Sequence, residues 1–262
     1  MFDCAVELFS FHRSPNHGCA FVSITGTPLV INSDYEMPAD GSLTIISTQS
    51  VISNDGAVTV TAWDIDLVGS LSAGTASMLL HGSQVDQTIG IGDMADMSVN
   101  NSEACRLVAN GGLTVGSSSS GDISIGGLTD DCTDSLGRVV LIATKPTKIV
   151  KFGEGAPSSF NKGITVQSNG VVLNGDLSTK ASQTILSLST GTLTITASSM
   201  LSTTSQELSI TVADTDIGVG AGLNSSAALT SITCSVPGSS IGLGNVSYLR
   251  FLASKTRADM II

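Results

Sequence analysis

The sequence has few charged and few aromatic residues. Charged residues make up 13% of the 262-residue chain and aromatic residues 4%, whereas charged residues alone usually account for about 25% of a soluble domain. Serine, threonine, glycine, valine, isoleucine and leucine fill the difference. This composition suits short strands joined by tight turns, because β-branched residues favour strands while glycine and serine favour turns.

Basic residues are half as frequent as acidic ones. Eleven lysines and arginines stand against 22 acidic residues, which gives a formal net charge of −11. Because nucleic-acid binding depends on clustered Lys and Arg, we expect no nucleic-acid partner. The charge fits a soluble protein, or one that gathers divalent cations.

Long hydrophobic runs are also missing. No stretch reaches the 18 apolar residues that indicate a membrane-spanning helix, so no transmembrane segment is expected. A signal peptide is not evident, because Asp3 and Glu7 stand where such a leader carries positive charge. Residues 1–39 show no steady alternation and are expected to form an irregular N-terminal segment; for a secreted protein, the native start would lie upstream of it.

The cysteines are odd in number and widely scattered, at Cys4, Cys19, Cys105, Cys132 and Cys234. Without a CxxC spacing they indicate neither a disulfide framework nor a zinc site. One or two bridges remain open, and the spacing does not predict their pairing.

Short segments that alternate apolar and small polar residues run from about Gly41 onward. A period of two is typical of a strand with one buried face, and no stretch has convincing helical periodicity. Examples of these segments are 43–45, 58–60, 113–115, 123–125, 139–142, 164–166, 193–195 and 208–210.

An internal repeat organises these segments. Residues 41–67 align with residues 191–217 without a gap, and after a two-residue insertion residues 89–92 align with 241–244. We therefore predict a repetitive region over 40–262, with one unit at 41–190 and an incomplete one at 191–262. The identical pairs in the first stretch are Gly41/Gly191, Leu43/Leu193, Thr44/Thr194, Ile45/Ile195, Thr61/Thr211, Asp64/Asp214 and Asp66/Asp216.

Stacked repeats of short strands without helices predict an all-β parallel β-helix, or β-solenoid. At about 20 residues per turn and about 4.8 Å between strands, residues 40–262 would form a rod roughly 50 Å long. Tandem β-sandwich domains share this composition and are the alternative architecture.

One stretch resembles a known family. Ile89 to Gly92, Ser102-Glu103 with Arg106, Gly111 to Ser117 and Gly121 to Ile125 are similar to the repeats of filamentous-haemagglutinin-like adhesins and related repetitive β-strand proteins. The resemblance implies a right-handed β-helix that serves as an adhesive stalk, and it carries over no catalytic residue. The second unit departs from the pattern, because Lys255 stands where the first has Glu103.

Two acidic pairs are the candidate metal ligands. Asp64 and Asp66 are two residues apart, so in a strand they project from one side, and Asp214 and Asp216 repeat them. Such pairs, completed by turn carbonyls, could hold calcium. The simpler interpretation is a solvated acidic edge that discourages strand pairing.

Three further groups of residues suggest other functions. Asp130, Asp131 and Asp134 with Arg138 form the candidate catalytic group of a polysaccharide lyase or hydrolase, because glycan cleavage uses clustered acids. Outward threonines suggest an ice-binding solenoid, and three sequons begin at the possible glycosylation sites Asn100, Asn224 and Asn245. The threonines are Thr59, Thr61, Thr192, Thr194, Thr196 and Thr211.

The composition, the repeat and the resemblance together favour a non-catalytic structural or adhesive protein. We expect it to be extracellular or on a cell surface, with surface glycans, matrix or neighbouring copies of itself as partners. No cofactor is expected apart from calcium.

Overall fold

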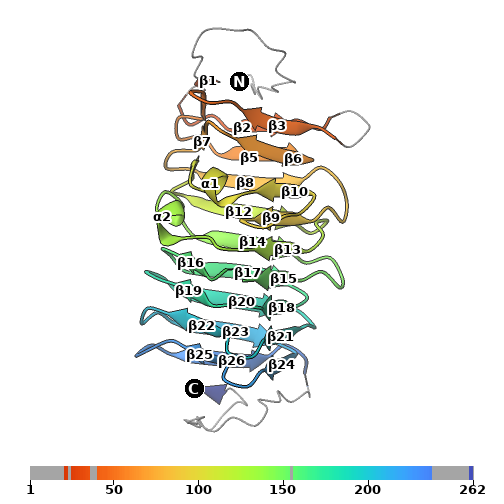
Figure 1. Ribbon diagram of the computed structural model, residues 1–262, viewed down its shortest axis with the longest axis vertical. Coiled ribbons are helices and arrows are strands. Elements are labelled where there is room, and N and C mark those ends of the chain that lie inside the picture. The colour runs from red at the N-terminus through yellow and green to blue at the C-terminus, as the bar shows by residue number, and fades with distance from the viewer. Residues whose placement is uncertain (1–20, 23–24, 36–39, 154–155, 238–259, 262) are drawn as a thin grey trace.

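The computed structural model describes residues 21–22, 25–35, 40–153, 156–237 and 260–261. Its short strands coil into a solenoid of about nine turns, and the order along the axis follows the order along the chain (Figure 1). The strands form three faces, which we call the long sheet, the second face and the third face.

The long sheet receives one strand from every turn. All its ladders between β2 and β26 are parallel, and β27 (Met260–Ile261) adds an antiparallel strand to β26. Its parallel strands are β2 (Leu29–Asn32), β5 (Val58–Ala62), β8 (Ser77–Gly82), β12 (Gly112–Ser117), β14 (Val139–Ala143), β17 (Ile164–Ser168), β20 (Thr184–Leu188), β23 (Leu208–Val212) and β26 (Thr230–Cys234).

The second face is divided into a two-stranded and a seven-stranded sheet. The first sheet contains β3 (Ser42–Ile45) and β6 (Asp64–Leu67). The second contains, in spatial order, β10 (Met97–Val99), β9 (Ile89–Ile91), β13 (Ile123–Ile125), β15 (Val150–Phe152), β18 (Val171–Leu173), β21 (Thr192–Ile195) and β24 (Asp214–Ile217).

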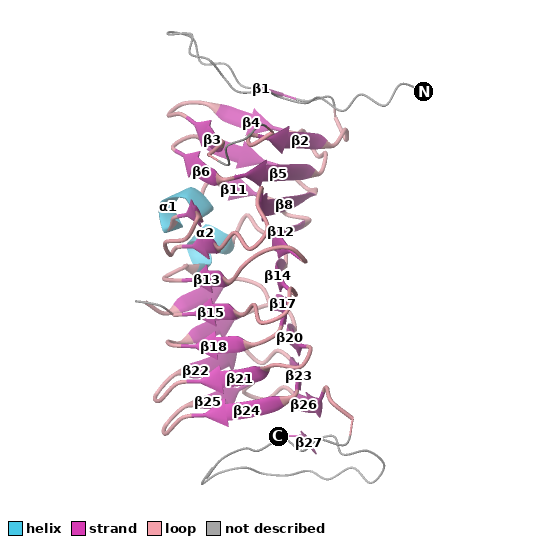
Figure 2. Ribbon diagram, turned by 90° about the vertical axis from the view of Figure 1, so that its right-hand side faces the viewer, coloured by secondary structure: helices cyan, strands magenta, loops and turns pink. Residues whose placement is uncertain are grey.

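The third face is divided into two four-stranded sheets, and two one-turn helices, α1 (Asn101–Ala104) and α2 (Asp130–Thr133), occur where it is interrupted. Figure 2 shows both helices on the side away from the long sheet. The strands are β1 (Phe21–Val22), β4 (Ser50–Ile52), β7 (Ser70–Ser72) and β11 (Leu107–Val108), followed by β16 (Ser158–Phe160), β19 (Leu177–Thr179), β22 (Met200–Thr203) and β25 (Gly222–Asn224).

This topology confirms the predicted parallel β-helix. Tandem β-sandwiches are wrong for this chain, because sandwich sheets are antiparallel and the ladders of the solenoid's turns are parallel. The structure also places β2, which lies within the segment 1–39, in the long sheet, where it pairs with β5. Among the described residues, no helix is long and apolar enough to cross a membrane.

The core is a stack of aliphatic side chains that point inward from the strands. Along the long sheet the register aligns one such residue per strand, and none is more than 4% exposed. Burying each of these side chains stabilises the fold by about 1.5–3 kcal/mol. The aligned residues are Ile31, Val60, Leu80, Val115, Leu141, Val166, Leu186, Ile210 and Ile232.

The two aligned stretches of the repeat form the same elements. Residues 41–67 contain β3 to β6 and residues 191–217 contain β21 to β24, on the same three faces in the same order. The repeated glycines are required by close packing: a Cβ at Gly191 would lie 1.1 Å from the carbonyl oxygen of Asn169 in the preceding turn. The aligned segment 241–244 lies outside the described residues.

The number of residues per turn varies more than the estimate of about 20 residues per turn implied. Register partners are 20 residues apart between Val58 and Met78 but 35 apart between Met78 and Leu113. The longer turn contains β9, β10 and α1, and β10 folds back beside β9 as an extra parallel strand. The long sheet therefore extends roughly 38 Å over eight strand spacings of about 4.8 Å.

Candidate functional site

The acidic pairs lie on the second face, near opposite ends of the solenoid (Figure 1). Asp64 and Asp66 belong to β6 and Asp214 and Asp216 to β24. Within each pair an inward residue separates the two carboxylates, so both project outward as predicted. In the described part of the chain, no group of three or more His, Cys, Asp or Glu side chains is placed to hold a metal ion. Calcium binding stays a prediction, since carbonyls or water would have to complete about six to eight ligands.

Asp64 also has a structural role. No ladder joins β6 to its neighbour β10, and charged side chains bridge the two segments instead. Asp64 Oδ1 accepts a hydrogen bond from the Ser98 N–H at 2.8 Å. Glu103 Oε1 accepts the Leu67 N–H at 2.9 Å, and the Arg106 guanidinium donates to the Leu67 carbonyl. These bonds satisfy backbone groups that a ladder would otherwise pair.

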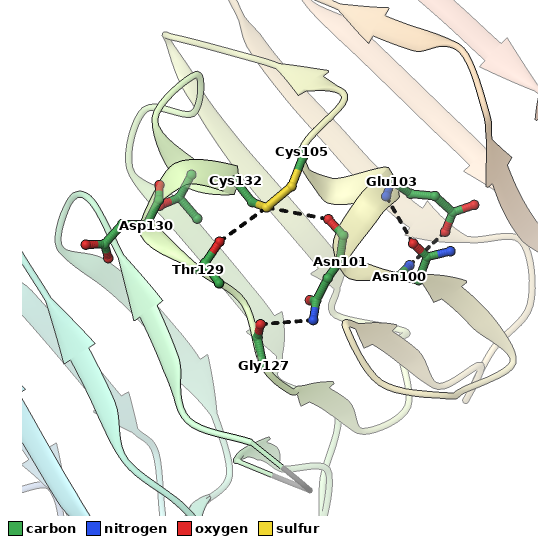
Figure 3. Close-up of a disulfide and its surroundings, with 9 residues drawn as sticks. Asn100, Asn101, Glu103, Cys105, Gly127, Thr129, Asp130 and Cys132 are labelled. Atoms are coloured by element: carbon green, nitrogen blue, oxygen red, sulfur yellow. Dashed lines mark hydrogen bonds between the residues drawn. A yellow bond between two sulfur atoms is a disulfide. The ribbon is translucent and has the colours of Figure 1, made fainter. Parts of the chain in front are cut away.

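Helix α1 positions the Glu103 carboxylate for this role. The Asn100 side chain accepts from the Glu103 N–H at 3.1 Å, and Glu103 Oε2 accepts from the Asn100 N–H at 2.7 Å (Figure 3). This reciprocal pair is a capping box. Glu103 is buried, with 6% of its surface exposed. Glu103 and Arg106, two residues of the adhesin-like motif, are therefore structural here.

A disulfide between Cys105 and Cys132 connects the two helices across adjacent turns (Figure 3). Cys105 caps α1 and Cys132 belongs to α2. The spacing alone could not predict this pair, since it depends on the insertions that place the helices side by side. Cys234 is half-buried and not bridged, while Cys4 and Cys19 lie outside the described residues.

The candidate catalytic acids have separate partners. Asp130 pairs with Lys180, Asp134 accepts from the Asn161 side chain, and Asp131 is exposed. Arg138 does not join them in any ion pair between described residues; it donates to the Thr165 hydroxyl at 3.1 Å instead. The structure thus places three acids on or beside α2 and directs the arginine to the long sheet. One observation still distinguishes Asp130: its second carboxylate oxygen is buried without a hydrogen-bond partner.

The six threonines do not form one array. Thr59, Thr61 and Thr211 project from the long sheet, but six turns separate β5 from β23. Thr192 and Thr194 lie on the second face. The sixth, Thr196, donates its hydroxyl to the Leu173 carbonyl at 2.8 Å. Ice binding through these six residues therefore has no continuous surface, although the long sheet carries other threonines.

The asparagines of the two described sequons are exposed, but their side chains already accept hydrogen bonds from the backbone. The Asn100 side chain caps α1, and the Asn224 side chain accepts from the Ser226 N–H at 2.9 Å. Asn245 lies outside the described residues. Glycosylation of these positions stays a prediction.

Sequence reasoning missed two electrostatic contacts between turns. Asp86 pairs with both Lys145 and Lys148, and their hydrogen bonds hold the pKa of Asp86 below its ordinary value. The Thr75 N–H and hydroxyl both donate to Asp55 and lower the pKa of that carboxyl. Their separations of 59 and 20 residues left no local signal.

The outer side of the long sheet was also missed as a unit. Its strands contain no Asp, Glu, Lys or Arg. Register aligns one outward column along all nine parallel strands, in which aliphatic and threonine side chains alternate over the first seven. The column is Val30, Thr59, Leu79, Thr114, Val140, Thr165, Ile185, Ser209 and Ser231.

The interior contains a small cavity between Ala104, Leu128, Leu136 and Phe160, with a volume of about 10 Å³. Its lining is apolar, and it is barely large enough for one water molecule. This cavity is too small to serve as a substrate site.

Comparison with known proteins gave no relative: no family model, curated protein or solved structure matches the chain. Function is therefore argued from the chain's own geometry.

Proposed function

We propose that this chain is a non-catalytic rod segment of an extracellular or cell-surface protein that presents its outer faces for adhesion. The observation that carries the proposal is the uninterrupted long sheet, whose interior is filled by aliphatic side chains and whose exterior is regular over nine turns. Regular stacking of this kind produces an extended surface suited to spacing or binding.

Two other observations support the proposal. The Cys105–Cys132 bridge is consistent with an oxidising compartment, because disulfides are rare in the cytosol. Several charged side chains that drew attention as candidate ligands or catalysts bond to other turns and stabilise the stack: Asp64 bonds to the next turn, and Asp130 to Lys180 two turns along.

The proposal is tested by incubating the full chain with a panel of neutral and acidic polysaccharides, with and without calcium. Retention of the protein without release of new sugar ends is the expected result. A requirement for calcium that Asp66→Asn abolishes would assign the acidic pair on β6 to binding. Release of sugar ends by the wild-type chain would overturn the non-catalytic proposal.

A polysaccharide lyase or hydrolase is the second candidate, favoured by the unpartnered buried oxygen of Asp130. Buried carboxylate oxygens normally have partners, so an exception suggests a functional group. Under this alternative, Asp130→Asn and Asp131→Asn would abolish the release of sugar ends. Glu207→Ala, which removes an exposed acid elsewhere, is the matched control.

A further inference from the structure

The long sheet differs from the other two faces in continuity. Its ladders run from β2 to β26 without interruption, whereas the second face is divided beside β10 and the third face beside the helices. Figure 2 shows the helices away from this sheet. Every large insertion of the described solenoid thus leaves the long sheet unobstructed.

The acidic side chains of the described strands also avoid the outer side of the long sheet. No strand of the long sheet carries Asp or Glu, whereas β6 and β24 on the second face carry two acids each, and α2 on the third face carries Asp130 and Asp131. Two basic groups reach the long sheet: the half-buried His81 on β8 and the Arg138 guanidinium, which donates to the Thr165 hydroxyl. In a chain with a net charge of −11, two copies repel each other least where neither surface carries carboxylates. This favours the long sheet as the surface through which copies approach.

The side chains on this face suit sheet-on-sheet packing. Outward residues such as Thr114, Val140, Thr165 and Ile185 are β-branched and similar in height, so their column forms an even surface. Two sheets of this kind pack with side chains interdigitated at a spacing of about 10 Å. Most polar groups on the face are hydroxyls and amides, which can pair with each other across such a contact. The His81 imidazole and the Arg138 guanidinium are already hydrogen-bonded to the hydroxyls of Thr61 and Thr165.

The available area sets the strength of the contact. Eight strand spacings of about 4.8 Å and strands of five residues at about 3.3 Å each give a face of roughly 600 Å². Two faces then bury roughly 1,200 Å², the lower limit for a specific interface. The expected complex is a weak, reversible dimer.

We propose that the long sheet is a self-association surface, through which two copies of this chain pack face to face. The inference deepens the proposed rod function and rests on it, because it names a neighbouring copy as one partner. Raising the salt concentration strengthens the dimer, since salt screens repulsion between the acidic copies while leaving contacts between uncharged side chains intact.

The test is sedimentation velocity of the full chain and two variants over a wide concentration range. Thr114→Glu places a carboxylate on the long sheet, and Ser124→Glu places one on the second face in the same turn. Both side chains are half-buried and both variants have the same net charge, so the pair separates local from global repulsion. Circular dichroism and melting temperature confirm that each variant folds.

The expected result is a wild-type dimer that strengthens with salt, a similar dimer for Ser124→Glu, and a dissociation constant raised at least about tenfold for Thr114→Glu. A wild-type chain that stays monomeric, or equal weakening by both variants, would overturn the inference. Ice recrystallisation inhibition by a monomeric wild type would assign the face to ice instead. Glycan retention by a monomer would keep the adhesive function while rejecting self-association.

Discussion

Replacing Glu103 by alanine tests whether side chains really substitute for the missing ladder between β6 and β10. Glu103 is buried and accepts from two backbone groups, the Leu67 N–H and the Asn100 N–H. Leu67 is fully buried, so its N–H would remain without a partner, at a cost of about 1–3 kcal/mol. Loss of the capping box adds about 1 kcal/mol. The variant should therefore be less stable by about 2–4 kcal/mol, mostly around this gap.

Amide hydrogen exchange is the appropriate assay, because a stacked solenoid can open locally without unfolding completely. We expect protection at the Leu67 amide to fall strongly in Glu103→Ala, while amides in β20 and β23 change little. Glu207→Ala removes an exposed glutamate and serves as the control. Unchanged protection at Leu67 would refute the idea that Glu103 replaces a ladder partner.

Three other perturbations give further expectations. Cys105→Ser removes a bridge that spans 27 residues, and should lower the free energy of unfolding by about 3.5 kcal/mol in the chain-entropy model; urea denaturation checks this, and an equal loss in Cys234→Ser would contradict it. Because the folded-state pKa of Asp86 is lowered from 3.8, its ion pairs contribute stability above that pH that is lost as the pH falls through the lower folded value. Asp86→Asn should therefore flatten the dependence of melting temperature on pH below about 4, and an unchanged slope would exclude this role. Asp64→Ala should cost about 1–2 kcal/mol even in EDTA, through the lost bond to Ser98, whereas Asp66→Ala should cost less; equal effects that appear only with calcium would support a metal site instead.

The repetitive part of the fold was predictable from local pattern. Alternating apolar residues identified the strands, and the aligned stretches 41–67 and 191–217 indicated stacked turns. Glycine at 41 and 191 marks positions where another backbone segment approaches closely: Ser33 of the same turn at Gly41, and Asn169 of the preceding turn at Gly191. These features depend on residues close in sequence or on residues that recur at the repeat spacing, so the sequence pattern predicts them.

The irregular turns were not predictable. Three features depend on the conformation of insertions between the stacked strands: the fold-back of β10 beside β9, the one-turn helices and the Cys105–Cys132 pair. The roles of the acids were not predictable for a similar reason, because Asp64 and Asp130 bond to residues 34 and 50 positions away in the sequence. The sequence could place these carboxylates on a surface but could not identify the turn that contains their partners.

The central claim is that the chain forms one continuous rod with a parallel strand from each turn. Spin labels at Thr59→Cys and Ser209→Cys, with Cys4, Cys19 and Cys234 replaced by serine, test it through their separation. The two residues lie in one column and six strand spacings apart, so electron–electron resonance should give a narrow distribution near roughly 29 Å. A broad distribution, or a distance that does not match six spacings, would contradict the continuous solenoid.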